Sequence, residues 1–358
     1  MATSDQWINQ RREAMLKVGL VGTGFAARKR AEALSQSDRA ELVGVCSRSL
    51  ERTQSFAQDF ETQAFPDLEA LLATTVDLVI VANRNVDHAD AVRLALKHHK
   101  HVVVEYPLAL YWGAAEELAH LAQQNDRLLH VEHIELLGGW HQSLRQQLPH
   151  LGTPRFVRYA TLQSKHPAPD HWTYRLREFG FPFVAALSRI HRLTDAFGTV
   201  SAVQAQAKFF PALESHEARR NLFTTCICTA QLFFEQGTLA IATYGKGENI
   251  WRSERLMEVY GDWGTFRLEN DTGTLFKEEG EMPLDVGGRT GLFREDTEAV
   301  LDHLLEGKPL YVSLESSLYA LKVATAIERA AATGQTMVMS PAPPGRKHHQ
   351  SLSQLTDL

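Results

Sequence analysis

A glycine-rich loop near the amino terminus carries the clearest chemical signal in this chain. A short apolar strand over residues 17–21 precedes Gly22-Thr23-Gly24-Phe25-Ala26-Ala27, a G-x-G-x-x-A pattern, and a helix follows. Gly22 permits a tight turn, Gly24 lets the backbone approach a pyrophosphate, and free N–H groups at the helix start favour a phosphate. The sequence predicts that a dinucleotide binds at Gly22, Thr23, Gly24, Phe25 and Ala26. The alternative is a Rossmann domain that has kept the loop only for structure.

The end of the second strand, over residues 42–46, discriminates between the two nicotinamide dinucleotides. Domains that bind NAD usually place an acidic residue there to hold the ribose 2′-hydroxyl, but this chain has Ser47, Arg48 and Ser49. The Arg48 guanidinium can make a forked contact with a 2′-phosphate, to which both hydroxyls can donate. We therefore predict a preference for NADPH. The alternative is that Arg48 is a solvated loop residue.

Polar side chains follow the later strands at 76–82 and 101–105. In open α/β sheets, cofactors bind at the carboxyl ends of the strands. We therefore expect further cofactor contacts from five residues: Asn83, Asn85, His88, Glu105 and Tyr106. His88 fits equally a helix start or the core, and Tyr106 fits equally a structural role in a turn with a cis Pro107.

Strands and helices alternate over the first 130 residues, which predicts a Rossmann domain, a doubly wound parallel sheet with helices on both faces. Longer strands follow from residue 150 on, with one helix predicted over Pro182–Phe197 and helix again over 294–332. The chain is thus predicted to be an α/β protein whose C-terminal α+β domain contains an open antiparallel sheet. The expected parts are a flexible tail at 1–15, an NADP-binding domain at 16–140, a substrate-binding domain at 141–338 and a flexible tail at 339–358.

Composition argues against several classes of function. The 358 residues carry a formal net charge of -6, and their scattered lysines and arginines argue against nucleic-acid binding. No apolar stretch is long enough to span a membrane, and the first 15 residues contain no secretory signal. Three cysteines, Cys46, Cys226 and Cys228, suit a reducing cytoplasm and lack the further ligands of a metal site. We predict a cytoplasmic protein without a metal, in which Cys226 and Cys228 face one side of a strand.

Two further segments, HVVVEYPLAL at 101–110 and LLHVEHIELLGGWH at 128–141, carry a family resemblance. With the glycine loop, they resemble the superfamily of glucose-fructose oxidoreductase, inositol dehydrogenase and rhizopine catabolism proteins. Most members carry a lysine where this chain has Tyr106, and an aspartate and a histidine where, aligned on Asp195, it has Ser188 and Arg192. The resemblance assigns those three groups to alcohol oxidation. A tyrosine with a pKa of about 10 or an arginine with a pKa above about 12 is a poor base at neutral pH.

One branch with these substitutions is the biliverdin reductases, and the chain resembles the cyanobacterial type most closely. The resemblance rests on Glu105-Tyr106-Pro107, the block at 130–137, Trp172-Thr173-Tyr174 and the block FGFPFVAALSRI at 179–190. It implies hydride transfer from C4 of NADPH to the C10 methine of biliverdin, with protonation of a pyrrole nitrogen, to give bilirubin. Such a site needs flat apolar walls, cations for two propionates, and positive charge near the ring nitrogens.

The same resemblance suggests which residues meet these needs. Arg189 is expected to assist protonation by polarising a water or stabilising charge, Arg192 to be its electrostatic partner, and Tyr106 to lie beside the nicotinamide. The predicted substrate contacts are Trp172, Phe181, Arg189, Arg192, Asp195 and Lys246. The alternatives are an Arg192–Asp195 ion pair with a solvated Arg189, core packing of the aromatic residues, and a solvated Lys246 in a turn.

Two rival functions stay open at this point. A dehydrogenase of a sugar or polyol would oxidise polyols and leave the visible absorption of biliverdin unchanged. A non-catalytic NADP-binding regulator would bind the cofactor tightly without turnover. The sequence is compatible with a monomer and with a homodimer.

Overall fold

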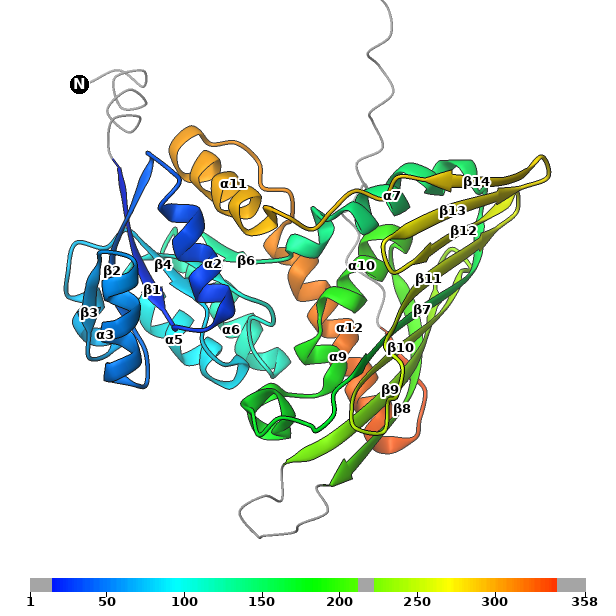
Figure 1. The fold of residues 1–358 in the computed structure, drawn as a ribbon, viewed down its shortest axis with the longest axis horizontal. Helices are drawn as coiled ribbons and strands as arrows, with labels where there is room; N and C mark the ends of the chain where they lie inside the picture. The colour runs from blue at the N-terminus through cyan, green and yellow to red at the C-terminus, as the bar shows by residue number, and fades with distance from the viewer. Residues whose placement is uncertain (1–14, 212–221, 340–358) are drawn as a thin grey trace, which may run out of the picture.

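The computed structural model describes residues 15–211 and 222–339, which form two units side by side (Figure 1). The N-terminal unit contains a parallel sheet of six strands in the order β3-β2-β1-β4-β5-β6. These strands are β1 (Leu16–Val21), β2 (Ala40–Cys46), β3 (Gln63–Phe65), β4 (Leu78–Val81), β5 (His101–Val104) and β6 (Leu129–Val131). The order confirms the predicted Rossmann sheet and places its switch point between β1 and β4.

Different helices cover the two faces of this sheet. They are α2 (Phe25–Leu34), α3 (Leu50–Asp59), α4 (Leu68–Leu72), α5 (Asn85–Lys97) and α6 (Trp112–Gln124). Ile80 packs in one apolar cluster with residues of α2 and α3, whereas its neighbour Val79 packs in another with residues of α5 and α6. Both faces of β4 are therefore buried, which explains why this strand is apolar throughout.

The C-terminal unit contains an open sheet of nine strands in the order β14-β13-β12-β11-β7-β10-β9-β8-β15. These are β7 (Pro154–Ser164), β8 (Val200–Pro211), β9 (Phe223–Phe234), β10 (Leu239–Gly247), β11 (Glu254–Gly261), β12 (Gly264–Glu269), β13 (Thr272–Lys277), β14 (Gly280–Leu284) and β15 (Met337–Val338). The predicted α+β domain is confirmed, with one difference: β7 and β10 run parallel. The helices after β7 lead the chain to β8, and β9 and β10 then follow as antiparallel neighbours, so that β10 lies beside β7.

Helices fill the space between the two sheets (Figure 1). The helices outside the Rossmann sheet are α7 (Gly139–Gln147), α8 (Leu176–Phe179), α9 (Pro182–Ala185), α10 (Ser188–Phe197), α11 (Leu292–Glu306) and α12 (Leu314–Thr333). Short 3-10 turns lie between some of them: η1 (Ile134–Leu136), η2 (Leu148–His150) and η3 (Trp172–Tyr174). The single helix predicted over Pro182–Phe197 is wrong, because Ala186 leaves the helical conformation with φ -101 and ψ 43. The whole segment from Phe181 to Ser188 is buried, so tertiary packing decides its path.

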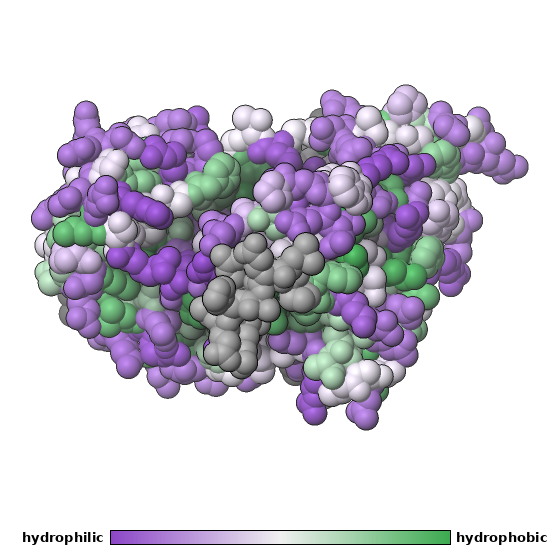
Figure 2. Space-filling view, turned by 60° about the horizontal axis from the view of Figure 1, so that its bottom comes forward, coloured by the Kyte–Doolittle hydropathy of each residue, from purple (hydrophilic) through white to green (hydrophobic). Residues whose placement is uncertain are grey.

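Cys226 and Cys228 lie buried on one face of β9, as predicted. Within residues 15–211 and 222–339, no group of three or more potential metal ligands occurs. Across the same ranges, no helix has the length and apolar character needed to cross a membrane. In the space-filling view, both units show a mostly hydrophilic surface with hydrophobic residues between the polar ones (Figure 2).

A buried ion pair joins the two units. Arg30 of α2 is fully buried; its Nε donates to Glu105 Oε1 at 2.9 Å, and one terminal nitrogen donates to Asp296 of α11. Asp296 also lies 2.8 Å from His130 Nε2 and accepts from the Tyr311 hydroxyl at 2.6 Å. Burial alone would raise the pKa of Asp296, but the charges of Arg30 and His130 hold it below its ordinary value. The carboxylate is therefore ionised, and its ion pair with Arg30 holds α11 against α2.

Asp296→Asn keeps the shape of this side chain but removes the charge that Arg30 faces. Because breaking a buried ion pair leaves its partner uncompensated, we expect the free energy of unfolding at pH 7 to fall by about 3–5 kcal/mol. Urea unfolding followed by tryptophan fluorescence measures this value. As a control, Asp262→Asn breaks an exposed pair with Arg155 and is expected to leave the stability nearly unchanged.

The same variant has a defined pH dependence. Since the pKa of Asp296 is lower in the folded protein than its ordinary value of about 4, its stabilising effect is complete above that pH and is lost as the pH falls through the folded-state pKa. The stability difference between wild type and Asp296→Asn should therefore shrink below about pH 4. A difference that stays constant down to about pH 3 would contradict this account of the ion pair.

Candidate active site

The glycine loop lies at the carboxyl end of β1, where the order of the sheet reverses. Gly22 has φ +119, and a Cβ there would lie 2.4 Å from the Ala82 carbonyl oxygen, so only glycine fits. Gly24 is the N-cap of α2 without a side-chain cap, and a Cβ there would meet nothing within 4 Å. Open space beside uncapped N–H groups fits the pyrophosphate of a dinucleotide. Phe25, at the start of α2, is 74% exposed beside this space.

The residues after β2 are arranged around an exposed arginine. Ser49 caps α3 by accepting from the Arg52 N–H, and the Ser47 hydroxyl lies 2.7 Å from the Thr53 hydroxyl. Arg48 is exposed and has no hydrogen bond or ion pair within the described part of the chain. Its guanidinium is therefore available to an anion, so contact with a ribose 2′-phosphate stays a prediction that fits the geometry.

Three of the residues predicted to contact the cofactor have partners within the protein. Asn85 donates to the Phe179 carbonyl at 2.8 Å, and Glu105 accepts from Arg30. The His88 Nδ1 lies 2.8 Å from the Pro107 carbonyl and its Nε2 lies 3.3 Å from the Asn83 carbonyl. His88 is buried, which fits the alternative of a core residue that holds two strand-end loops together. The Asn83 side-chain oxygen, by contrast, is buried at the end of β4 without a partner.

Tyr106 lies between the two units, in a cis peptide with Pro107. Its ring stacks on His133 with centroids 5.6 Å apart and planes 5° apart. Burial raises the pKa of Tyr106 to about 12, although the charge of Arg189 lowers it. The hydroxyl is therefore protonated at neutral pH and has a hydrogen to donate.

Arg189 of α10 lies near Tyr106, and Arg192 follows three residues later on the same helix. Arg189 donates to Thr161 Oγ1 at 3.4 Å and to Ser188 Oγ at 3.1 Å, and its guanidinium lies 5.4 Å from the centre of the Tyr244 ring. Although burial opposes it, neighbouring groups led by Tyr106 raise the pKa of Arg189 above its ordinary value, so the guanidinium stays charged. The alternative of a solvated Arg189 is wrong.

Arg192 is buried and held by other elements. It donates to the Tyr159 hydroxyl at 2.7 Å and to Glu135 Oε2 at 3.2 Å. Asp195 instead lies 2.8 Å from His141 Nε2 and 3.8 Å from Arg145. The alternative of an Arg192–Asp195 ion pair is therefore wrong, because tertiary partners compete for both side chains.

Two of the predicted substrate residues, Trp172 and Lys246, both lie beside the Phe179 ring. Trp172 is half-buried and its ring lies 6.3 Å from that of Phe179, while Phe181 is buried. Lys246 is buried in β10, where its Nζ donates to the Thr173 carbonyl and lies 3.6 Å from the centre of the Phe179 ring. Burial lowers the pKa of Lys246 to about 8. The alternative of a solvated Lys246 in a turn is therefore wrong. The contact of Lys246 with a propionate stays a prediction.

Sequence reasoning missed a group of charged residues beside Arg192. Glu135 of η1 accepts from Arg192, contacts Arg289, and lies 3.9 Å from Arg255. The motif LLHVEHIELLGGWH contains Glu135 but gives no sign of its partners, since Arg255 and Arg289 lie more than 100 residues further along the chain. Their proximity arises only from the fold.

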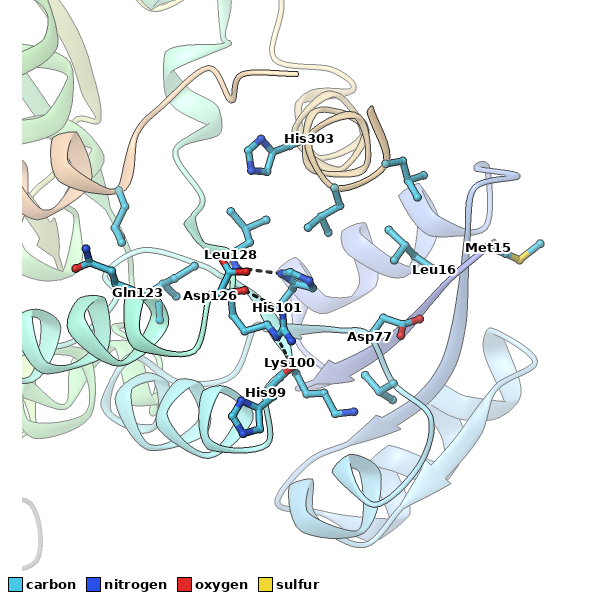
Figure 3. A pocket seen from close by; sticks show the side chains of 17 residues that line it. Met15, Leu16, Asp77, His99, Lys100, His101, Gln123, Asp126, Leu128 and His303 are labelled. Carbon is cyan, nitrogen blue, oxygen red and sulfur yellow. Dashed lines mark hydrogen bonds between the residues drawn. The ribbon is translucent and has the colours of Figure 1, made fainter. Parts of the chain in front are cut away.

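A pocket of about 830 Å³ lies at the amino ends of the Rossmann strands, opposite the end that carries the glycine loop. Residues at the amino ends of the strands line it, among them Leu16, Asp77, His101 and Leu128, together with His303 of α11 (Figure 3). Because cofactors bind at the carboxyl ends of such strands, this pocket is separate from the candidate active site.

Family models match both units of the chain. The oxidoreductase family with an NAD-binding Rossmann fold matches residues 16–133, and the C-terminal alpha/beta domain of the oxidoreductase family matches residues 145–339.

Individual relatives point in the same direction. Mouse (Mus musculus) biliverdin reductase A is 35% identical over 38% of this chain, a match that spans only 43% of the mouse protein. Human (Homo sapiens) biliverdin reductase A is 29% identical over 62% of this chain and 70% of that protein. The crystal structure of biliverdin reductase from Synechocystis sp. PCC 6803, in complex with biliverdin and NADP+, is 46% identical with a TM-score of 0.85, covering 88% of this chain and 99% of that one.

Substitutions of the two loop glycines distinguish a role in cofactor binding from a role in the fold. Gly24→Ala adds a methyl group to open space, so we expect unchanged thermal stability but an affinity for NADPH at least about tenfold weaker, because the methyl group blocks the approach of the phosphate. Gly22→Ala should instead lower the melting temperature, since it clashes with the Ala82 backbone and disfavours a positive φ. Fluorescence titration with NADPH and thermal unfolding measure the two effects; unweakened NADPH binding by Gly24→Ala would refute the assignment.

Proposed function

The chain belongs to the oxidoreductase family with an NAD-binding Rossmann fold, and we propose that it uses NADPH to reduce biliverdin to bilirubin. The observation that carries the proposal is the set of donors around Tyr106. The hydroxyl of Tyr106 is protonated at neutral pH and the guanidinium of Arg189 is charged. Alcohol oxidation needs a base at this place, whereas a conjugated acceptor that gains electrons needs donors and positive charge.

The comparison with solved structures supports the same substrate and cofactor. The Synechocystis protein, described in complex with biliverdin and NADP+, matches across both units. The exposed Arg48 after β2 supports NADPH over NADH on independent grounds, because a guanidinium there suits a 2′-phosphate. Buried free cysteines at positions 46, 226 and 228 suit the reducing cytoplasm in which we infer that the enzyme works.

In this proposal each group of residues has a defined task. The glycine loop would hold the pyrophosphate, Arg48 with Ser47 and Ser49 would hold the 2′-phosphate, and Asn83 and Tyr106 would contact the nicotinamide. Bound there, the reduced nicotinamide supplies the hydride that the C10 methine of biliverdin accepts.

On the substrate side, Arg189 polarises a water or stabilises the charge that develops as a pyrrole nitrogen is protonated. Arg192, held by Tyr159 and Glu135, adds positive potential. Trp172 and Phe181 provide apolar walls for the tetrapyrrole.

Turnover with NADPH and biliverdin tests the proposal. We expect the red absorbance of biliverdin to fall while the blue absorbance of bilirubin rises. Arg189→Ala should lower kcat by about 100-fold or more, because it removes a donor to developing charge. The exposed Arg329→Ala on α12 is the matched control. Oxidation of a polyol without any change in biliverdin absorbance would refute the function, and full kcat in both Arg189→Ala and Arg192→Ala would refute the assigned roles.

Cofactor preference gives an independent prediction. A hydrogen bond to a charged group contributes about 1.5–3 kcal/mol, so Arg48→Ala should lower kcat/KM for NADPH by roughly 10- to 100-fold and leave that for NADH nearly unchanged. Arg93→Ala, on α5 and paired with Glu117, is the control. A wild-type enzyme that clearly prefers NADH would contradict the role of Arg48.

A further inference from the structure

Arg189 differs from Arg30 and Arg192 in the chemistry of the groups that hold it. Arg30 and Arg192 each form ion pairs with carboxylates. Arg189 instead donates to two hydroxyls, from Nη1 to Ser188 Oγ at 3.1 Å and from Nε to Thr161 Oγ1 at 3.4 Å. In the part of the chain that the structure describes, no carboxylate forms an ion pair with Arg189. Because a hydroxyl accepts a hydrogen bond without carrying a charge, the positive charge of Arg189 is held but not cancelled.

The two hydroxyls reach the guanidinium from different elements. Ser188 is the first residue of α10 and is only 3% exposed. Its place at the start of the helix follows from Ala186, whose departure from helical geometry separates α9 from α10. Thr161 lies on β7, opposite Tyr244 of β10, and the Tyr244 ring centre lies 5.4 Å from the guanidinium carbon. A helix and a sheet thus fix Arg189 together, through three neutral groups.

Ser188 also acts on Tyr106, the second donor of the candidate active site. Burial raises the pKa of Tyr106, whereas Arg189 and the Ser188 hydroxyl lower it. Burial opposes the charge of Arg189, but Tyr106 leads the neighbouring groups that raise the pKa of Arg189. Ser188 therefore lies close to both groups that the proposed function places at the reaction.

We propose that Ser188 and Thr161 are positioning residues, which hold the Arg189 guanidinium with neutral hydroxyls and so leave its positive charge to the substrate. This inference rests on the proposed function. Donors that are fixed before the reaction stabilise developing charge without having to reorganise. A carboxylate at position 188 could fix the guanidinium as well as a hydroxyl does, but it would neutralise the charge that the electron-accepting tetrapyrrole needs.

Ser188→Asp and Ser188→Asn have nearly the same shape and differ in charge, so they separate electrostatics from packing. Ser188→Asn should keep kcat for biliverdin within about fivefold of wild type, whereas Ser188→Asp should lower it by about 100-fold, because its carboxylate neutralises Arg189. The KM for NADPH should change little in either variant. The control is Ser317→Ala on α12, which removes an equally buried hydroxyl that has no hydrogen-bond partner among the described residues. Equal kcat in the two Ser188 variants would overturn the proposal.

Removal of each hydroxyl tests the positioning itself. Ser188→Ala and Thr161→Val should each lower kcat by about tenfold, because the guanidinium loses one of its two fixed contacts. The KM for biliverdin should change less than about threefold, since the charge that attracts the substrate remains. Thr161→Ser restores the hydroxyl and should recover most of the lost kcat. Wild-type kcat in both Ser188→Ala and Thr161→Val would contradict the assigned roles.

Nuclear magnetic resonance of ¹⁵N-labelled arginine side chains separates this inference from the proposed function. The Nε–H signal of Arg189, assigned by its loss in Arg189→Lys, reports the contact with Thr161 without turnover. Thr161→Val should speed the exchange of this hydrogen with water by about tenfold. If exchange speeds up although no bilirubin forms, the positioning stands and the function fails. If bilirubin forms but exchange and kcat in Thr161→Val match wild type, the positioning fails and the function stands. Because valine keeps the branched shape of threonine, this variant is expected to fold even if Ser188→Asp does not.

Discussion

The buried charge of Arg30 is the constraint on which the arrangement of the two units depends. Its guanidinium has no access to water and is neutralised from two directions, by Glu105 at the end of β5 and by Asp296 of α11. A buried cation without such partners would be strongly destabilising. The two ion pairs therefore fix three segments relative to one another: α2 after the glycine loop, the loop that carries Tyr106, and α11. Because Glu105 directly precedes Tyr106, the ion pair also fixes the backbone that carries Tyr106.

In the candidate active site, by contrast, the positive charge is not fully neutralised. Around Glu135 the cations outnumber the anion, and Tyr106 and Arg189 offer donors where a dehydrogenase of alcohols needs a base. A preorganised excess of positive charge suits a substrate that is itself an anion and that gains electrons during the reaction. Glu135 is needed because it holds Arg192 and Arg289 together, and without it the like charges would repel one another.

Features encoded within a short stretch of chain were predictable from the sequence. The glycine loop and the alternation of strands and helices depend on neighbouring residues or on a periodic pattern, and the replacement of a lysine by Tyr106 is visible through the family resemblance. The missed features depend on distant ones. Arg30 and Asp296 are separated by 266 positions, and nothing local shows that they meet. The alternative Arg192–Asp195 pair had correct helical spacing, but Arg192 donates to Tyr159 and Asp195 contacts His141 instead. Lys246 follows a glycine, as turn residues often do, but it lies buried in β10. Its ammonium contacts the Phe179 ring and donates to the Thr173 carbonyl there.

We propose that this site delivers a hydride to a carbon of a conjugated tetrapyrrole instead of exchanging one with an alcohol. NADPH deuterated at the transferable position of C4, incubated with the enzyme and biliverdin, follows that hydride directly. We expect nuclear magnetic resonance of the product to show deuterium at C10 of bilirubin, in an amount equal to the NADPH consumed. A product without deuterium at C10, or deuterium found instead on the alcohol carbon of a reduced sugar, would contradict it.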